Sequence, residues 1–208
     1  INRTSSKTQS ALLEAMEERQ ITVDGRTYPL EKPFVVIATQ NNVGTAGTQF
    51  LPYAQVDRFM VRLSVGYPDH DAQMALLRDR LSENPLDAVE QVLTREELLA
   101  MQADVRAVQT GDALLDYITR MTMASREHPN VEVGVSPRGA LLLCRMAKAR
   151  AYLLGRAFAV SEDVQAVFEP VCAHRLIVSA KARLAGVSAA DVVRELLADV
   201  PNPDRAAL

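Results

Sequence analysis

Residues 33–42, PFVVIATQNN, join an uninterrupted apolar run to a polar end, and this combination decides the fold class. Phe34 to Ala38 are typical of a strand that is buried on both faces, as in a parallel sheet covered by helices. The four residues that follow, 39–42, carry hydroxyl and amide groups. Because ligands of open α/β sheets bind beyond the carboxyl ends of the strands, we expect residues 39–42 to face a ligand. The alternative is that these amides only cap the next turn.

The sequence on either side of this run also indicates an α/β region. Good helix formers extend from a capping box at Ser6 to Arg19. Residues 20–30 form two short β-prone runs around an Asp-Gly pair, the strongest short-range signal for a hairpin. Residues 59–65 alternate apolar and polar side chains, which predicts a strand with one wetter face.

The character of the chain changes after residues 66–70, where a Gly-Tyr-Pro sequence predicts a hinge. From residue 71 onward the periodicity is helical, and several helix starts carry capping signals. We expect an all-helical second part. The predicted helices span residues 71–82, 95–108, 112–127, 137–155, 162–175 and 188–199.

Composition excludes several classes of protein. The 208 residues are 48% hydrophobic and 24% charged, as in an ordinary globular chain, and the net charge is −3. We therefore expect no nucleic-acid partner and, without an 18-residue apolar run, no direct membrane insertion. The two cysteines, Cys144 and Cys172, lie in apolar helical patterns and are expected as free thiols in the cytoplasm, a disulfide being the alternative. The three histidines have no metal-ligand spacing, so no metal site is predicted.

Arg138 breaks a local rule of helix design. Ser136 and Pro137 are typical N-cap and N1 residues, so Arg138 lies in the first helical turn. A cation there is disfavoured by about 0.3–1 kcal/mol, but an anion shared with the free backbone N–H groups would reverse the penalty. The alternative is an ion pair with a nearby carboxylate.

Two further arginines follow Pro52. Arg58 precedes the predicted strand at 59–65, and Arg62 lies on the polar face of that strand. A guanidinium held at a domain surface can bind phosphate with two N–H groups, in its own or a neighbouring subunit. The plainer alternative is an exposed pair between Asp57 and Arg58, which stabilises little.

Taken in this order, these stretches resemble the MoxR family of AAA+ ATPases. The resemblance covers nearly the whole chain, and its combination of motifs is highly specific. The sequence departs from the family pattern at Asn42, where Pro is usual, and at Tyr53, where an acid is common. The matching segments are residues 1–41, 51–68, 114–118, 128–156 and 174–179.

The resemblance implies an α/β fold, a partial AAA+ P-loop NTPase core followed by an all-α lid domain. Residues 1–66 would be the C-terminal part of the core, a parallel sheet with a β-hairpin insertion, and residues 67–208 the helical lid. It further implies that Asn41 is sensor 1, that Arg58 is an arginine finger offered in trans, and that Arg138 is sensor 2. Arg62 remains a rival for the finger.

The implied function is ATP hydrolysis by a chaperone-like remodelling protein. Its cofactors would be ATP and Mg²⁺, with most ligands in Walker A and B motifs upstream of Ile1, so the 208 residues alone are expected to be inactive. The implied partners are further copies of the chain, in a homo-oligomeric ring such as a hexamer, and a von Willebrand factor A-domain protein or another client. The alternative is a non-catalytic helical adaptor. A nucleic-acid motor is disfavoured because Arg26 is the only basic residue of the hairpin at 20–30.

Overall fold

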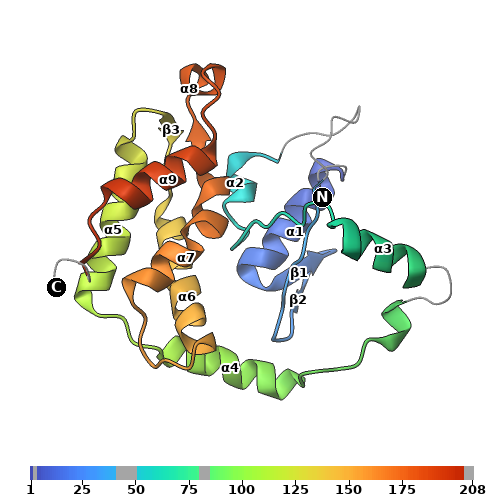
Figure 1. The fold of residues 1–208 in the computed structure, drawn as a ribbon. Helices are drawn as coiled ribbons and strands as arrows, with labels where there is room; N and C mark the ends of the chain where they lie inside the picture. The colour runs from blue at the N-terminus through green and yellow to red at the C-terminus, as the bar shows by residue number, and fades with distance from the viewer. Residues whose placement is uncertain (2–3, 41–50, 80–84, 204–208) are drawn as a thin grey trace.

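The computed structural model describes residues 1, 4–40, 51–79 and 85–203. Figure 1 shows their arrangement, with α1, β1, β2 and α3 grouped apart from helices α5 to α9, with α2 beside those helices, and with α4 at the bottom of the view. The elements are α1 (Ser6–Glu18), β1 (Gln20–Val23), β2 (Arg26–Pro29), α2 (Tyr53–Val56), α3 (His70–Asp79), η1 (Pro85–Ala88), α4 (Arg95–Ala107), α5 (Asp112–Glu127), β3 (Val131–Val133), α6 (Pro137–Leu153), α7 (Ser161–Cys172), η2 (Ala173–Arg175), β4 (Ile177–Val178), α8 (Ala180–Leu184) and α9 (Ala189–Asp199).

Helix starts follow the capping signals of the sequence, with one shift. Thr94 and Ser188 form the predicted capping boxes at the starts of α4 and α9. At α1 the cap is Ser5 rather than Ser6, because the Ser5 hydroxyl accepts the N–H of Thr8 at 3.2 Å. The helix therefore begins with Ser6 as its first residue, one position earlier than a Ser6 cap implies.

The hairpin forms as predicted. Strands β1 and β2 pair antiparallel, with Gln20 opposite Pro29 and Val23 opposite Arg26. Both turn residues have positive φ, 49° at Asp24 and 74° at Gly25. A type I′ turn requires this conformation at both central positions, and Asp-Gly adopts it readily.

Two expected strands are absent from the described residues. Residues 34–38 and 61–65 form neither helix nor strand, and the sheets that do form are the antiparallel pairs β1–β2 and β3–β4, not a parallel sheet. The side chains meant for a sheet core are exposed, Ile37 by 90% and Val65 by 100%. A strand completes its backbone hydrogen bonds only with a neighbouring strand, and the described residues place none beside these segments.

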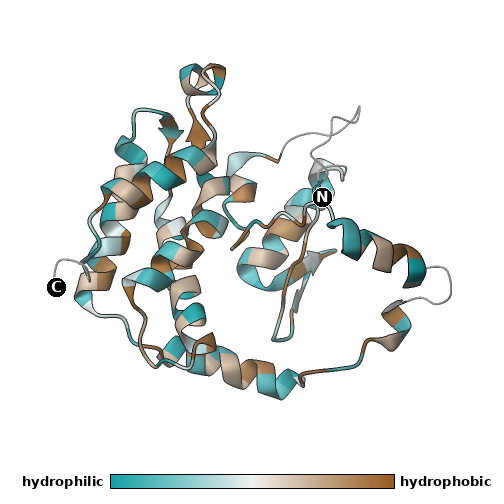
Figure 2. Ribbon diagram, viewed as in Figure 1, coloured by the Kyte–Doolittle hydropathy of each residue, from teal (hydrophilic) through white to brown (hydrophobic). Residues whose placement is uncertain are grey.

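The hydrophobic core lies in the helical region, residues 95–203. Helix α6 packs against α7, and α5 and α9 cover the same cluster (Figure 1). Brown and teal alternate along these helices in Figure 2, as expected for amphipathic helices around one core. Its fully buried large side chains include Tyr117, Met121, Leu143, Val164 and Phe168. The domain boundary expected at residues 66–67 stays a prediction.

The cysteines and the helix lengths bear on two expectations from composition. Cys144 and Cys172 are both free thiols, as expected. Burial raises the pKa of Cys172 to about 12, so this thiol stays protonated in the helical core. None of the helices among the described residues has the length and apolarity needed to cross a bilayer.

Candidate functional site

The residue before Arg58 is anchored by a buried ion pair. Arg175 Nε donates to Asp57 Oδ1 at 3.0 Å, and its Nη2 donates to the Asp57 carbonyl at 3.0 Å. Arg175 is fully buried and Asp57 nearly so. A buried cation is tolerated when carboxylate and carbonyl acceptors satisfy its donors. The backbone that presents Arg58 is thereby fixed to η2 of the helical region.

Arg175 occupies a pocket that a glycine makes possible. Its guanidinium also donates to the carbonyls of Phe59, at 2.5 Å, and of Val171. A Cβ on Gly139 would lie 2.9 Å from Arg175 Cδ and 2.6 Å from Val135 Cγ1. No side chain larger than hydrogen fits at position 139 unless both Val135 and Arg175 move.

Arg138 is carried by the same network. Ser136 is the N-cap of α6, as predicted, because its Oγ accepts the N–H of Gly139 at 3.0 Å. The same hydroxyl donates to Asp57 Oδ2 at 2.9 Å. Tyr53 adds a second tie, since its hydroxyl donates to the carbonyl of Gly134 at 3.3 Å. These contacts join the start of α6 to the segment that carries Arg58.

Glu17, in the last turn of α1, binds both candidate arginines. Arg58 Nη2 lies 2.7 Å from Glu17 Oε2, and Arg138 Nη2 donates to Glu17 Oε1. The side chains are partly exposed, by 25% for Arg58, 31% for Glu17 and 44% for Arg138. The alternative of an exposed pair between Asp57 and Arg58 is wrong, because Asp57 pairs with Arg175. Both site arginines instead share the carboxylate of Glu17. The alternative given for Arg138, an ion pair with a nearby carboxylate that the sequence did not identify, is thus present.

The geometry around Glu17 fits an anion with several oxygens. The hydrogen bond from Arg138 chiefly holds the pKa of Glu17 below its usual range; burial opposes this, and the charge of Arg58 adds to it. The Glu17 carboxylate is thus ionised. Its two oxygens contact one guanidinium each, so a single anionic group can bind both arginines. Arginine binds carboxylate and phosphate oxygens with similar geometry, so the same pair suits a nucleotide phosphate. Among the described residues, no three His, Cys, Asp or Glu side chains cluster as a metal site would require.

Two other candidates have different outcomes. Asn41 and Asn42 lie outside the described residues. Arg62 is exposed, its backbone N–H donates to the carbonyl of Pro170 at 2.9 Å, and within the described chain its side chain forms no ion pair. The structure therefore brings Arg58, and not Arg62, to the carboxylate that binds Arg138.

His174 borders the buried network as a neutral base. Its Nε2 lies 2.6 Å from Arg175 Nη1 and 3.2 Å from the carbonyl oxygen of Phe59. Burial first, and the charge of Arg175 next, lower the pKa of His174 from 6.5 to about 4. Protonating His174 would place two cations side by side within this network.

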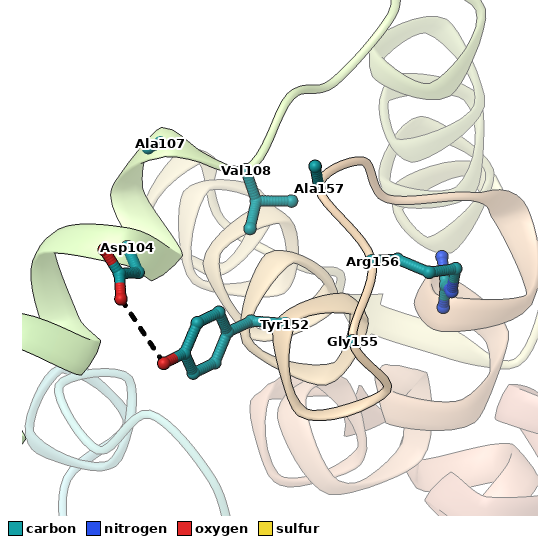
Figure 3. A pocket seen from close by; sticks show the side chains of 7 residues that line it. All are labelled: Asp104, Ala107, Val108, Tyr152, Gly155, Arg156 and Ala157. Atoms are coloured by element: carbon teal, nitrogen blue, oxygen red, sulfur yellow. Dashed lines mark hydrogen bonds between the residues drawn. The ribbon is translucent and has the colours of Figure 1, made fainter.

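A separate hollow of about 330 Å³ lies between α4 and the end of α6 (Figure 3). Its polar side chains already have partners: within the hollow the Tyr152 hydroxyl donates to Asp104 at 3.4 Å, and Arg156 binds the buried carboxylate of Asp163 at 2.5 Å. None of the candidate site residues lines it.

Sequence reasoning missed Glu17, Asp57 as an anchor, and Arg175. Asp57 was considered only as a surface partner of Arg58, and Arg175 lies in a matching segment, residues 174–179, without an assigned role. One signal for Glu17 existed. An acidic residue in the last turn of a helix meets the negative end of the dipole, as unfavourable as Arg138 in a first turn.

Comparisons with known proteins identify two families of sequence in the chain. Residues 1–61 match the ATPase family associated with various cellular activities (AAA), and residues 123–196 match the AAA lid domain. The second match lies within the helical region that carries Arg138 and Arg175.

Similar proteins cover almost the whole chain. It is 41% identical to the protein YeaC of Bacillus subtilis, over 98% of this chain and 63% of YeaC. It is 35% identical to the chaperone MoxR1 of Mycobacterium tuberculosis, over 98% of this chain and 56% of MoxR1. It is 30% identical to the protein MoxR of Methylorubrum extorquens, over 98% of this chain and 65% of that relative.

A solved structure shares the fold. A crystal structure of a candidate ATPase from Cytophaga hutchinsonii superposes with a TM-score of 0.90 at 34% identity, over 97% of this chain and 64% of that chain. The 208 residues thus span less than two thirds of these relatives, and the fold class inferred from the sequence, an AAA+ core followed by a helical lid, is confirmed. The chain belongs to the MoxR family of AAA+ ATPases.

Proposed function

We propose that this chain supplies one half of an ATP-hydrolysis site in a chaperone-like remodelling ATPase. In the full-length protein, Asn41 would act as sensor 1, Arg58 as the arginine finger and Arg138 as sensor 2. The convergence of Arg58 and Arg138 on the carboxylate of Glu17 carries the proposal. Two guanidiniums from segments 80 positions apart meet where one anion binds both.

The reaction class suits residues of this kind. Phosphoryl transfer needs little covalent chemistry from the protein and depends on positioning and on stabilising the charge of the transition state. When bound, ATP with Mg²⁺ supplies the phosphoryl group. Arg58 would stabilise negative charge on its oxygens, Arg138 would orient the same oxygens, and the Asn41 amide would orient the attacking water.

The network around Arg175 would keep this arrangement in place. Asp57 binds Arg175 on one side and Ser136 on the other, so the mounts of Arg58 and Arg138 are tied together. A misplacement of about 1 Å can cost a hundredfold in rate, which makes such a tie valuable in a site built on positioning.

The wider setting follows from the family. The chaperone name of the Mycobacterium tuberculosis relative supports protein clients, and we propose a homo-oligomeric ring, such as a hexamer, acting in the cytoplasm on a von Willebrand factor A-domain protein or another client. In such a ring Arg58 would serve the nucleotide of the neighbouring subunit.

The test is ATP turnover by the full-length protein. Arg58→Ala is expected to lower kcat by about 10³-fold or more, since an arginine finger contributes roughly 10³–10⁵. Asn41→Ala should keep nucleotide binding and slow hydrolysis. Arg194→Ala is the matched control, because Arg194 is an exposed arginine that pairs with Asp191 on α9. Equal turnover by the Arg58 and Arg194 variants would refute the proposed role of Arg58.

Mixing experiments separate the remaining readings. Arg58→Ala subunits mixed with a variant that lacks its water-activating acid should regain activity if the finger works in trans. Absence of restoration would assign Arg58 to its own subunit. A full-length protein that binds clients but neither binds nor hydrolyses ATP would favour the non-catalytic adaptor.

A further inference from the structure

Glu17 and Arg138 each occupy the helix end that disfavours their charge. Glu17 lies in the last turn of α1, where the dipole is negative, and Arg138 lies in the first turn of α6, where it is positive. Their ion pair offsets both penalties. Charges placed against local preference in this way are typical of functional sites.

The three groups are mounted differently. Arg58 and Arg138 are both linked to the buried Asp57–Arg175 pair, through the adjacent residue and through Ser136. Glu17 comes from α1, which packs on β1 in the N-terminal part of the chain (Figure 1). The backbone segments that carry the two arginines are therefore tied together, and the carboxylate reaches both side chains from another element.

The hydrogen bonding of Arg58 is incomplete when it binds Glu17. Arg58 Nη2 has its carboxylate partner, but Arg58 Nε is buried and has no partner within the described chain. A buried donor without an acceptor is unfavourable, so this pose is not the best one open to the guanidinium. An anion with three terminal oxygens offers more acceptors than one carboxylate.

We propose that Glu17 is a positioning residue whose carboxylate takes the place of nucleotide phosphate oxygens, holds Arg58 and Arg138 together between turnovers, and is displaced when nucleotide binds. The inference rests on the proposed function, because it assigns both arginines to the nucleotide. It adds a group that competes with the nucleotide and so sets its apparent affinity.

If Glu17 competes with nucleotide for the two arginines, removing its charge should change KM for ATP, which a purely structural role of Glu17 would not do. In the full-length protein, Glu17→Gln keeps the size of the side chain and removes its charge, so nucleotide no longer displaces an anion. Since partly exposed ion pairs contribute modestly, KM for ATP should fall about two- to tenfold. Because Glu17 has left the arginines in the transition state, kcat should stay within about twofold of wild type.

Glu18→Gln is the matched control. Glu18 is the next residue, is exposed, and accepts a hydrogen bond from Gln20 at 2.8 Å instead of binding an arginine. Its KM and kcat should equal those of wild type. A KM for Glu17→Gln that matches the Glu18 variant would overturn the proposal. A large fall in kcat at unchanged KM would overturn it too, since Glu17 would then act in the transition state.

A direct measurement separates failure of this inference from failure of the proposed function. Carboxyl-labelled glutamate followed by NMR reports the pKa of Glu17 in the full-length protein, with and without tripolyphosphate. We expect the pKa to rise towards its ordinary value when tripolyphosphate displaces the carboxylate. An unchanged pKa in a protein that hydrolyses ATP and needs Arg58 rejects the role of Glu17 alone, whereas absence of hydrolysis rejects the proposed function.

Discussion

The helical region, residues 95–203, buries its apolar side chains more completely than the N-terminal region, residues 1–66. The helical region closes its own core around Tyr117, Leu143 and Phe168. In the N-terminal region α1 and the hairpin form, but the apolar segments 34–38 and 61–65 stay largely exposed. A helix makes its backbone hydrogen bonds within itself, whereas a strand needs a neighbouring strand. The predicted helices therefore form, and the predicted parallel sheet does not form among the described residues.

The largest effect expected from this contrast comes from truncating one apolar side chain in each region. Phe168→Ala should destabilise the 208-residue chain by about 3–5 kcal/mol, because it leaves a cavity in a fully buried position. Ile37→Ala should change the free energy of unfolding by less than about 0.5 kcal/mol, since Ile37 is exposed. Urea denaturation measures both, and similar losses would break the contrast.

The buried ion pair that joins the two regions should matter nearly as much. Arg175→Met leaves Asp57 buried without its cation, which costs about 3–5 kcal/mol. Arg194→Met is the control, because its ion pair with Asp191 is exposed and stabilises little. Thermal unfolding of the two variants should differ clearly. If they unfold together, Arg175 does not carry the connection between the regions.

Acid should weaken the same connection through His174. The pKa of His174 is lowered from 6.5 to about 4 by burial first and by the charge of Arg175 next. Below pH 6.5 His174 is protonated in the unfolded chain but stays neutral in the folded chain. The contribution of His174 to the free energy of unfolding is therefore fully present above pH 6.5 and is lost as the pH drops towards 4. The loss reaches at most about 3 kcal/mol.

Urea denaturation at pH 4.5 and pH 7 checks this dependence. His174→Gln should lose part of it, and the exposed His70→Gln should retain it. Equal pH dependence in the two variants would show that other groups cause the acid effect.

The smallest expected effect concerns the helix caps. Ser136→Ala removes the cap of α6 and its hydrogen bond to buried Asp57, whereas Ser188→Ala removes a cap on the exposed start of α9. A cap alone contributes about 1 kcal/mol. The Ser136 variant should lose measurably more than the Ser188 variant in a thermal melt, and equal losses would remove Ser136 from the network.

The local features of the fold were predictable from the sequence because their causes are local. The Asp24-Gly25 turn and the caps at Thr94, Ser136 and Ser188 depend on a few neighbouring residues. The N-cap of α1, predicted at Ser6 and found at Ser5, also depends on neighbouring residues. Ser5 and Ser6 are adjacent hydroxyls with equal capping chemistry, and the sequence could not choose between them.

The partners of the site arginines were not predictable. Any of 26 acidic residues could pair with Arg138, and the choice of Glu17 depends on packing between segments 121 positions apart. Burial of Arg175 depends in the same way on Gly139 and Asp57. The strands at 34–38 and 59–65 failed for a related reason, since alternation and apolarity describe a strand's faces but do not supply its neighbours.

The most direct test of the anion site is a crystal structure of the full-length protein with a non-hydrolysable ATP analogue. We expect the terminal phosphate oxygens to lie within hydrogen-bonding distance of Arg58 and Arg138, from the same or the adjacent protomer, with Glu17 released from both. A terminal phosphate bound away from both guanidiniums in every protomer would contradict the site proposed for this chain.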